Sequence, residues 1–217
     1  NICSFNLKEV CETAIALIKD PNVQIADTLI APDFAGGGFL LYDREQLENI
    51  YKTGRGSFKV RAKYAYDKSA NCIDITEIPP TTNVESIIEK IIDLAKQKKI
   101  TEISDIRDET DKKGLKITID LKRGVDAEKI MKKLYKSTPL QDSFSCNFNI
   151  LIGGMPRVMG VGEILGEWTA WRTECVRRKL YHDLQKKKAK LHLLKGLRKI
   201  LLDIDRAIAI IRDTEED

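Results

Sequence analysis

The sequence predicts an α+β fold: a two-layer α/β sandwich with a mainly antiparallel sheet, followed by a long α-helical coiled-coil arm. Two observations predict the sandwich. Pairs of strand-like segments alternate with amphipathic helices, and short polar turns join the strands within each pair. A third observation predicts the arm, because apolar residues recur at intervals of three and four from Val161 onward without an interrupting proline.

The N-terminal part of the chain contains two helical patterns. Residues 7–19 have apolar residues at helical spacing and are followed by Asp20-Pro21, so we expect a helix that ends there. Residues 44–51 are a second candidate helix. Between the two, Gly36-Gly37-Gly38 predicts a turn or a close approach of the backbone to another group.

A glycine-rich turn then leads into a basic segment. Between Asn49 and Tyr66 there are five Lys or Arg residues and no Asp or Glu, although the net charge of the chain is only +4. If residues 58–66 form one strand, its alternation places apolar and aromatic side chains on one face and Lys59, Arg61 and Lys63 on the other. Basic side chains then repeat every ~6.6 Å, a spacing that suits a polyanion such as a nucleic acid backbone.

The remaining elements follow from alternation, turns and caps. We expect further strands at residues 72–78, 100–106 and 115–121, and a closing hairpin from residues 148–152 and 157–159. The strand at 72–78 pairs with the basic strand through a turn at residues 68–71. Thr82 and Glu85 have the spacing of a capping box before an apolar stripe, which predicts one helix, and residues 127–136 predict another.

The C-terminal run is too long for a globular core. If wholly helical, its ~50 residues span about 75 Å, so it must pack on a partner helix along part of its length. Lys and Arg residues between Arg172 and Lys190 make its first half basic. They fit either the solvated flank of a coiled coil or a charged passage for a nucleic acid.

Composition limits the possible classes of protein. A chain of 217 residues with 42% hydrophobic content supplies a core, and no stretch approaches the ~18 apolar residues of a transmembrane helix. The chain starts without Met and without a signal-peptide pattern, which predicts a fragment of a longer protein. Five scattered cysteines without a C-x-x-C pair, and only two histidines, predict free thiols and no metal site.

Five residues are candidates for contact with a nucleic acid: Lys52, Arg55, Lys59, Arg61 and Lys63. One interpretation is that they form only the solvated face of an edge strand, whose charges protect it from aggregation. The absence of neighbouring acids, and the flexible, amide-rich turn at residues 53–56, favour contact with phosphates instead. Such binding would be independent of sequence and strongly weakened by salt.

Other candidate sites are weaker. Residues 105–114 superficially resemble a calcium loop, but Arg107 interrupts the ligand pattern and no closing glutamate follows, so we expect ion pairing and a turn, with acids orienting Arg107. No G-x-S-x-G motif or Cys–His setting indicates a nucleophile. The residues alone therefore predict a nucleic-acid-positioning module with a helical arm, whose chemistry is carried elsewhere.

Seven motifs in a fixed order carry a family resemblance. They are Tyr51-x-Thr-Gly-Arg-Gly, Thr76-Glu-Ile-Pro, Ile103-x-Asp-x-Arg-Asp-Glu-Thr-Asp, Leu121-Lys-Arg, Leu134-Tyr-Lys-x-Thr-x-Leu-Gln141, Phe144-x-x-Asn147 and Leu191-His-x-Leu-x-Gly-Leu197. Together they resemble the A subunit of bacterial type IIA DNA topoisomerases, that is, DNA gyrase or topoisomerase IV. The resemblance extends over essentially the whole chain.

The resemblance implies a division of the chain. Residues 1–24 resemble the helical exit from the winged-helix region, residues 25–158 the tower domain, and residues 159–217 the outgoing coiled-coil helix toward the C-gate. It implies that the return helix lies beyond Asp217, apart from first turns near residues 205–212. Gyrase and topoisomerase IV differ chiefly outside this region, so the sequence does not distinguish them.

The resemblance also implies partners and chemistry. In this family an active-site tyrosine that follows an arginine attacks the DNA, and none of the six tyrosines here follows an arginine. The catalytic tyrosine is therefore expected upstream of residue 1. The implied partners are double-stranded DNA, a topoisomerase B subunit that carries Mg²⁺ and ATP, and a second A subunit in an A₂B₂ holoenzyme of the bacterial cytoplasm, associated with the nucleoid. No cofactor and no membrane contact are implied for this chain.

Two functional hypotheses follow. In the first, the chain binds and bends the gate DNA of an ATP-dependent enzyme that breaks, passes and rejoins double strands, and Arg55 is the contact that the matched motif supports most directly. In the second, it is a non-enzymatic coiled-coil scaffold with a solvated basic edge strand.

Overall fold

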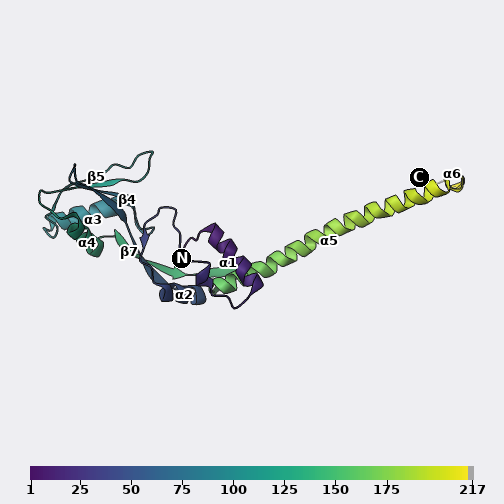
Figure 1. Cartoon of the computed structure of the whole chain (residues 1–217), viewed down its shortest axis with the longest axis horizontal. Coiled ribbons are helices and arrows are strands. Elements are labelled where there is room, and N and C mark those ends of the chain that lie inside the picture. The colour runs from purple at the N-terminus through teal and green to yellow at the C-terminus, as the bar shows by residue number, and fades with distance from the viewer. Residues whose placement is uncertain (215–217) are drawn as a thin grey trace. The chain divides into compact units, whose positions relative to one another are not determined.

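The structure is a computed structural model that describes residues 1–214. In chain order its elements are α1 (Leu7–Lys19), the short 3₁₀ helix η1 (Ile25–Asp27), β1 (Phe39–Leu40), α2 (Arg44–Thr53), β2 (Arg55–Arg61), β3 (Lys63–Asp67), β4 (Cys72–Glu77), α3 (Val84–Lys96), β5 (Ile103–Asp108), β6 (Ile117–Leu121), α4 (Ala127–Ser137), β7 (Gln141–Asn147), β8 (Asn149–Ile152), β9 (Met155–Val158), α5 (Val161–Leu202) and α6 (Ile204–Asp213) (Figure 1).

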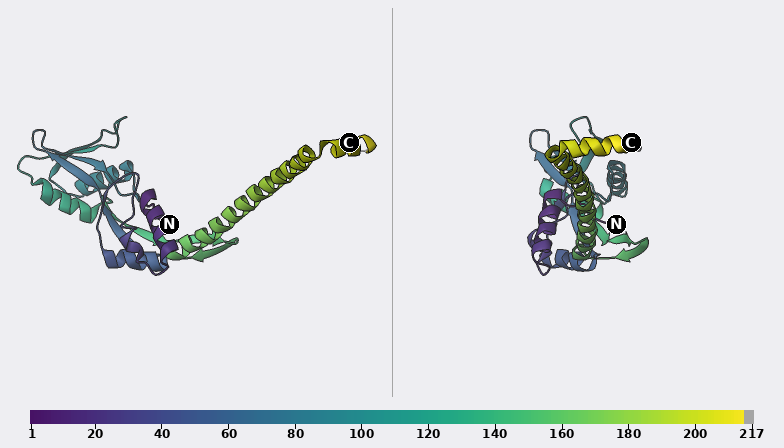
Figure 2. Two further views of the ribbon diagram at one scale, coloured as in Figure 1. Left: turned by 45° about the vertical axis from the view of Figure 1, so that its right-hand side comes forward. Right: turned by 90° about the vertical axis from the view of Figure 1, so that its right-hand side faces the viewer.

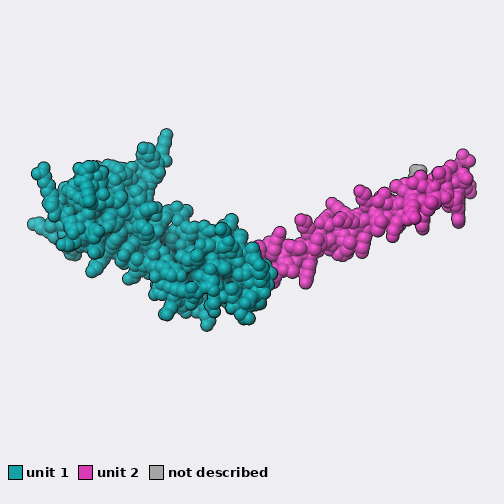
Figure 3. All heavy atoms as spheres, viewed as in Figure 1, with its two compact units in different colours: residues 1–166 teal, residues 167–217 magenta. Residues whose placement is uncertain are grey.

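The chain divides into two compact units, Asn1–Gly166 and Glu167–Asp217 (Figure 3). The strands named above lie in unit 1, and α5 begins in unit 1 and continues into unit 2. The predicted α+β class with a long helix is confirmed. The single sheet expected from the strand pattern is wrong, because the strands form three antiparallel sheets, in the orders β1-β2-β7, β3-β4-β6-β5 and β8-β9.

One half of unit 1, residues 63–140, forms the inserted lobe. Its four-stranded sheet pairs Ile73 with Ile119 and Ile75 with Ile117, and these four side chains are fully buried. They pack in one core with the apolar faces of α3 and α4, which cover that face of the sheet (Figures 1 and 2). The alternate residues of the strands, among them Asp74 and Asp120, belong to the opposite face and bear ion pairs.

The start of α3 differs in detail from the predicted capping box. Asn83 is the N-cap residue, and its side chain accepts a hydrogen bond from the amide of Ser86 at 2.8 Å. Thr82 therefore lies one residue outside the helix. Asparagine is as good an N-cap as threonine or better, which explains why the helix begins one residue later than the capping-box spacing indicates.

The other half of unit 1, residues 1–61 and 141–166, forms the framing lobe. Strands β1, β2 and β7 pack with α1, α2 and the start of α5 around a second core, which contains Leu47, Tyr51 and Phe148. Phe58 of β2 stacks on Phe144 of β7 with ring centroids 5.4 Å apart. The helix predicted at residues 7–19 is confirmed as α1.

The chain passes between the two lobes at Ala62 and at Leu140. The amide of Ala62 donates to the carbonyl of Leu140 at 2.7 Å, so the two crossings lie side by side. The single strand predicted for residues 58–66 is therefore wrong: it divides at Ala62 into β2 and β3, which belong to different sheets. The apolar alternation runs through the division, because Phe58, Val60 and Ala62 are all buried, and for this reason the sequence pattern does not reveal it.

Close backbone contacts fix the start of α5 to the end of α2. A Cβ atom at Gly160 would lie 2.4 Å from the carbonyl oxygen of Lys52 and 2.5 Å from that of Tyr51. A Cβ atom at Gly54 would lie 2.3 Å from the carbonyl oxygen of Met159. Only glycine fits at both positions, so the segment before α5 packs directly on the backbone of α2.

The described part of unit 2 consists of most of α5 and of α6, which meet at Asp203. Most of its large apolar side chains are exposed, for example Leu180 at 61% and Leu193 at 67%. The continuous helix expected to residue 211 is wrong, because the backbone leaves the helical conformation at Asp203, with φ −146° and ψ 69°, and the Asp203 side chain caps α6 by accepting from the amide of Arg206. A separate helix, α6, covers the residues at which the first turns of a return helix were expected, and its identity as part of that helix stays a prediction. Within residues 1–214, no helix combines the length and apolar character needed to cross a membrane.

Candidate nucleic-acid interface

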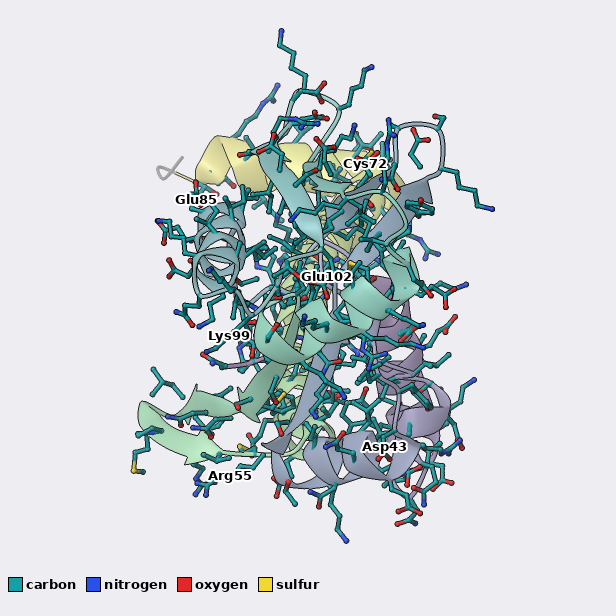
Figure 4. All side chains as sticks on the ribbon, turned by 90° about the vertical axis from the view of Figure 1, so that its left-hand side faces the viewer. Asp43, Arg55, Cys72, Glu85, Lys99 and Glu102 are labelled. Carbon is teal, nitrogen blue, oxygen red and sulfur yellow. The ribbon has the colours of Figure 1, made fainter. Side chains whose placement is uncertain are left out.

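Two of the predicted basic residues flank the C-terminal end of α2. Asp43 caps the first turn of this helix, and Lys52 lies in its last turn. Arg55 follows Gly54 as the first residue of β2, so Asp43 and Arg55 lie near opposite ends of α2 (Figure 4). The side chains of Lys52 and Arg55 are exposed and have no partner within residues 1–214.

The turn at residues 53–56 is a rigid helix cap. Gly54 adopts the left-handed conformation with φ +71° and donates its amide to the carbonyl of Ile50. The amide of Arg55 donates to Oγ1 of Thr53, and Gly56, with φ +144°, is paired with Cys146 of β7. Two amides of this amide-rich turn, those of Gly54 and Arg55, are therefore used within the protein. The exposed side chains of Lys52 and Arg55 are the groups of this turn that remain without a partner in the described residues.

The polar face of β2 carries the next group of candidate residues. Arg55, Ser57, Lys59 and Arg61 alternate along this strand and so share one face. Lys59 is exposed and has no side-chain partner in the described part of the chain. The face opposite it is packed in the core through Phe58 and Val60, which confirms the predicted alternation within β2.

Strand β7 extends this face with uncharged hydrogen-bonding groups. Its register with β2 pairs Arg55 with Asn147, Ser57 with Ser145, Lys59 with Ser143 and Arg61 with Gln141. Directly paired residues of antiparallel strands point to the same side, so the combined surface contains basic, hydroxyl and amide side chains and no acid. We call it the β2–β7 polar face. Hydroxyl and amide groups of this kind commonly donate to DNA phosphates.

Arg61 is the innermost member of this face. Its Nε donates to Oε1 of Gln141, and its Cζ lies 5.1 Å from the centre of the Tyr135 ring. Tyr135 is itself fixed, because its hydroxyl donates to the carbonyl of Ala62 at 2.8 Å. The guanidinium is therefore held in place by neutral groups and keeps its positive charge unneutralised.

Lys63 lies in β3, beyond the lobe crossing, and is neutralised. Its Nζ lies 3.1 Å from Oε1 of Glu77, whose Oε2 accepts a hydrogen bond from the amide of Gly38 at 2.6 Å. These two contacts, first the Gly38 amide and then Lys63, hold the pKa of Glu77 below its usual range. The close approach predicted for the triple glycine is thus an approach to a carboxylate, since a Cβ atom at Gly37 would lie 2.2 Å from Glu77 Oε2.

The structure accordingly separates the five predicted residues. Lys52, Arg55 and Lys59 are cations of the framing lobe without a partner in the described residues, and Arg61 is held by Gln141 and Tyr135 at the crossing. Lys63 is ion-paired within the inserted lobe to Glu77, whose other carboxylate oxygen accepts from the Gly38 amide of the framing lobe. Strand β2 lies in the middle of its sheet, whereas β3 is at an edge. The interpretation of a solvated edge strand therefore applies to Lys63 and does not apply to Lys59.

The comparisons with known proteins match the whole chain. The family model for the A subunit of DNA gyrase/topoisomerase IV matches residues 1–217. The chain belongs to this family. The DNA gyrase A subunit of Borreliella burgdorferi is 37% identical over 221 residues, which cover 99% of this chain and 27% of the relative. Those of Metamycoplasma arthritidis and Staphylococcus aureus are 39% and 36% identical, each covering 100% of this chain and 25% of the relative.

The chain thus spans about a quarter of the length of the curated relatives that it matches. The gyrase/topoisomerase IV A-subunit motifs recognised in the sequence correspond to structural features. The motif that starts at Tyr51 forms the C-terminal cap of α2. The motif from Leu134 to Gln141 supplies Tyr135 and Gln141, the two side chains that hold Arg61. Strand β7 was not among the predicted elements. The alternation of Gln141, Ser143, Ser145 and Asn147 is the signal that predicts its polar face.

The motif around Arg107 forms an ion-pair network on the outer face of the inserted lobe. Arg107 contacts the carboxylates of Asp105, Glu109 and Asp120, and Lys116 lies 2.9 Å from Glu109. Hydrogen bonds, first from Lys116 and then from Thr118, lower the pKa of Glu109 to about 2. The predicted ion pairing around Arg107 is confirmed, and it joins side chains of β5 and β6 with Glu109 at the edge of the sheet.

Three of the tyrosines, Tyr51, Tyr66 and Tyr135, pack in a core or contact neighbouring side chains. Tyr51 is buried at 2% exposure in the core of the framing lobe, and burial raises the pKa of its hydroxyl. Tyr135 contacts Arg61, and the hydroxyl of Tyr66 donates to Asn71. A nucleophilic phenol needs access and a lowered pKa, which Tyr51 lacks.

Proposed function

We propose that this chain is the part of a type II DNA topoisomerase A subunit that binds and bends the duplex to be cleaved. The observation that carries the proposal is the β2–β7 polar face: a surface of free cations, hydroxyls and amides without an acid, in a chain that belongs to the gyrase/topoisomerase IV A-subunit family. The ligand class is the phosphate backbone of double-stranded DNA, bound independently of sequence.

The geometry suits bending because the cations stand on a rigid support. Arg55 and Lys59 belong to the central strand of a sheet whose other side is packed in the core. Bending a site of 20–30 base pairs costs about 1–6 kcal/mol, and contacts to several phosphates can offset that cost only if the cations do not move with the DNA. Side chains anchored on β2 meet this condition better than lysines on a loop.

We assign DNA cleavage, metal binding and ATP hydrolysis to other parts of the enzyme. We propose that the tyrosine that attacks the DNA lies in the portion of the subunit preceding residue 1, and that a B subunit supplies Mg²⁺ and the ATPase. No group of three or more His, Cys, Asp or Glu side chains within residues 1–214 is placed to hold a metal ion. The chain's contribution is to hold and position the duplex in a double-strand-passage isomerase.

The proposal extends to the assembly. We assign residues 1–24 to the exit from a winged-helix region, 25–158 to a tower domain and 159–217 to the outgoing coiled-coil helix toward a C-gate. The exposed apolar side chains of unit 2 support a partner helix. The proposed holoenzyme is an A₂B₂ assembly with a second A subunit, located with the DNA in the bacterial cytoplasm.

The test is DNA binding by the full-length A subunit. Arg55→Glu/Lys59→Glu places two negative charges on the β2–β7 polar face, and we expect affinity for a duplex of about 30 base pairs to fall at least roughly 30-fold in low salt. The matched control is Lys90→Glu/Lys96→Glu, two exposed lysines of α3 without partners in the described residues. Fluorescence anisotropy at several salt concentrations measures both.

A second readout addresses bending directly. Energy transfer between dyes at the two ends of the duplex should rise on binding to the unmodified protein and stay low with the double variant at saturating concentration. The 217-residue chain alone should leave no protein covalently attached to DNA. Equal affinity of the double variant and its control would contradict DNA binding by this face, and covalent attachment by the isolated chain would contradict the assignment of the tyrosine.

A further inference from the structure

A groove of about 620 Å³ opens in unit 1 between α4 and the crossing from β2 to β3. One wall is formed by α4, which contributes Glu128, Lys132, Tyr135 and Lys136. These residues lie on one side of the helix, because residues three or four apart in a helix are neighbours on its surface. The facing wall contains Arg61 and Tyr64. The groove is thus lined by cations and aromatic rings, together with the apolar side chains of Leu41 and Met131, from segments about 70 residues apart in the sequence.

Arg61 is prepared to bind an anion in this groove. Gln141 accepts from Nε alone, and the ring of Tyr135 supports the guanidinium from its face. Both terminal nitrogens, Nη1 and Nη2, have no partner within residues 1–214. A guanidinium held by its Nε keeps a two-pronged pair of donors that matches the oxygens of a phosphate group, and little side-chain freedom remains to be lost on binding.

The charge of the groove favours an anion as well. Lys132 and Lys136 are exposed and unpaired in the described part of the chain, and Glu128 is the one acid among the lining residues. With Arg61 the lining carries three positive charges against one negative charge. By contrast, Lys133, on another face of the same helix, is neutralised by Glu102 at 3.0 Å.

The groove also continues the proposed DNA surface. Arg61 is the last residue of the β2–β7 polar face, two positions after Lys59 and on the same side of the strand. A backbone that follows Arg55 and Lys59 toward the crossing therefore reaches Arg61 and then the α4 wall.

We propose that this groove is a second phosphate-binding site, in which Arg61, Lys132 and Lys136 hold the DNA backbone where it leaves the β2–β7 polar face. The inference rests on the proposed function. It adds the inserted lobe to the DNA surface, so that the duplex contacts both lobes of unit 1, and it assigns Tyr135 and Gln141 as positioning residues that act through Arg61.

The experiment uses the same duplex with the full-length protein. Lys132→Glu/Lys136→Glu should weaken binding about tenfold, and the slope of log affinity against log salt concentration should become shallower by about 2. Lys90→Glu/Lys96→Glu on α3 is again the control, with affinity and slope unchanged. Arg61→Lys keeps the charge but loses the two-pronged geometry, and we expect a loss of about threefold to tenfold.

The positioning role has its own readout. Gln141→Leu removes the acceptor of Nε without changing any charge, so it should lower affinity while leaving the salt slope unchanged. Circular dichroism and thermal melting of each variant show whether it is folded. A variant with an intact fold and a changed slope would contradict the positioning role of Gln141.

The outcomes separate this inference from the proposed function. If Arg55→Glu/Lys59→Glu weakens binding and Lys132→Glu/Lys136→Glu does not, the groove is not part of the DNA surface, while the proposed function stands. If neither double variant weakens binding, both proposals fail. If calorimetry shows that inorganic phosphate or a mononucleotide binds the groove but DNA affinity is insensitive to its lysines, the site serves a small ligand, and the assignment to DNA is overturned.

Discussion

Units 1 and 2 differ in how far they bury the apolar side chains of their helices. In unit 1 the apolar stripes of α2, α3 and α4 are buried, and Ile50, Ile73 and Ile117 have no exposed surface, whereas Leu7, Ile15 and Ile18 of α1 are more than half exposed. In unit 2 the apolar stripe of α5 is exposed, with Leu180 and Leu197 more than half exposed. Apolar periodicity therefore predicts a helix in both units but a core only in the first. Unit 1 is expected to fold by its own contacts, whereas unit 2 depends on a partner helix.

The largest loss of stability is expected from a cavity in the core of unit 1. Phe58→Ala removes a buried ring that stacks on Phe144, so we expect the free energy of unfolding of unit 1 to fall by about 3–5 kcal/mol. Urea denaturation followed by hydrogen-exchange mass spectrometry of the strand peptides measures the loss. A change below about 1 kcal/mol would show that the framing lobe is not held by this core.

A smaller effect is expected just before α5, at Gly160. Gly160→Ala forces a methyl group against the carbonyls of Tyr51 and Lys52, and overpacking of this kind costs about 1–3 kcal/mol. Gly166→Ala within α5 meets no atom within 4 Å and should stabilise by up to about 1 kcal/mol, because alanine is the better helix former. Thermal melting of the pair gives the comparison, and equal melting temperatures would refute the close contact.

Acid provides a third test, at the ion pairs of the inserted lobe. The pKa of Glu109 is lowered from its ordinary value of 4.5 to about 2, so its contribution to stability is complete above about pH 4.5 and disappears as the pH falls through about 2. Glu109→Gln should therefore lower the melting temperature at pH 7 and have little effect near pH 2. A difference that is the same at both pH values would mean that the carboxylate charge is not responsible.

The smallest effect is expected in unit 2. Leu197 of the apolar stripe is 55% exposed, so Leu197→Ser should change the unfolding free energy of unit 1 by no more than about 0.5 kcal/mol. The same substitution in the full-length protein should cost more, because there the partner helix is expected to cover this residue. Equal effects in the 217-residue chain and in the full-length protein would remove the distinction between the two units.

Much of this fold is readable from the sequence, for local reasons. The helix at residues 7–19, the turn at 68–71 and the α+β class follow from spacing, prolines and caps, which act over a few residues. The division of the predicted strand at Ala62 has no local signal, because the alternation of buried residues continues through it.

The site was predicted less completely than the fold, because the charged residues that neighbour a side chain in the folded protein can be distant from it in the sequence. The five basic residues have no acidic neighbour along the chain, yet Lys63 is neutralised by Glu77 from the adjacent strand. Gln141, which holds Arg61, lies 80 positions away in sequence. Strand register decides such pairs. The alternating polar residues of β7 could have been recognised, but only the register with β2 places them beside Lys59.

The lobe crossing has a topological consequence. The chain enters the inserted lobe after Ala62 and leaves it at Leu140, and a single hydrogen bond joins these two residues. The 77 intervening residues, from 63 to 139, therefore form an insertion in the framing lobe whose two ends are adjacent. If these residues were removed, a tight turn could join the two ends. Such an arrangement allows a lobe to be acquired, enlarged or replaced in one step without rethreading the sheet from which it departs.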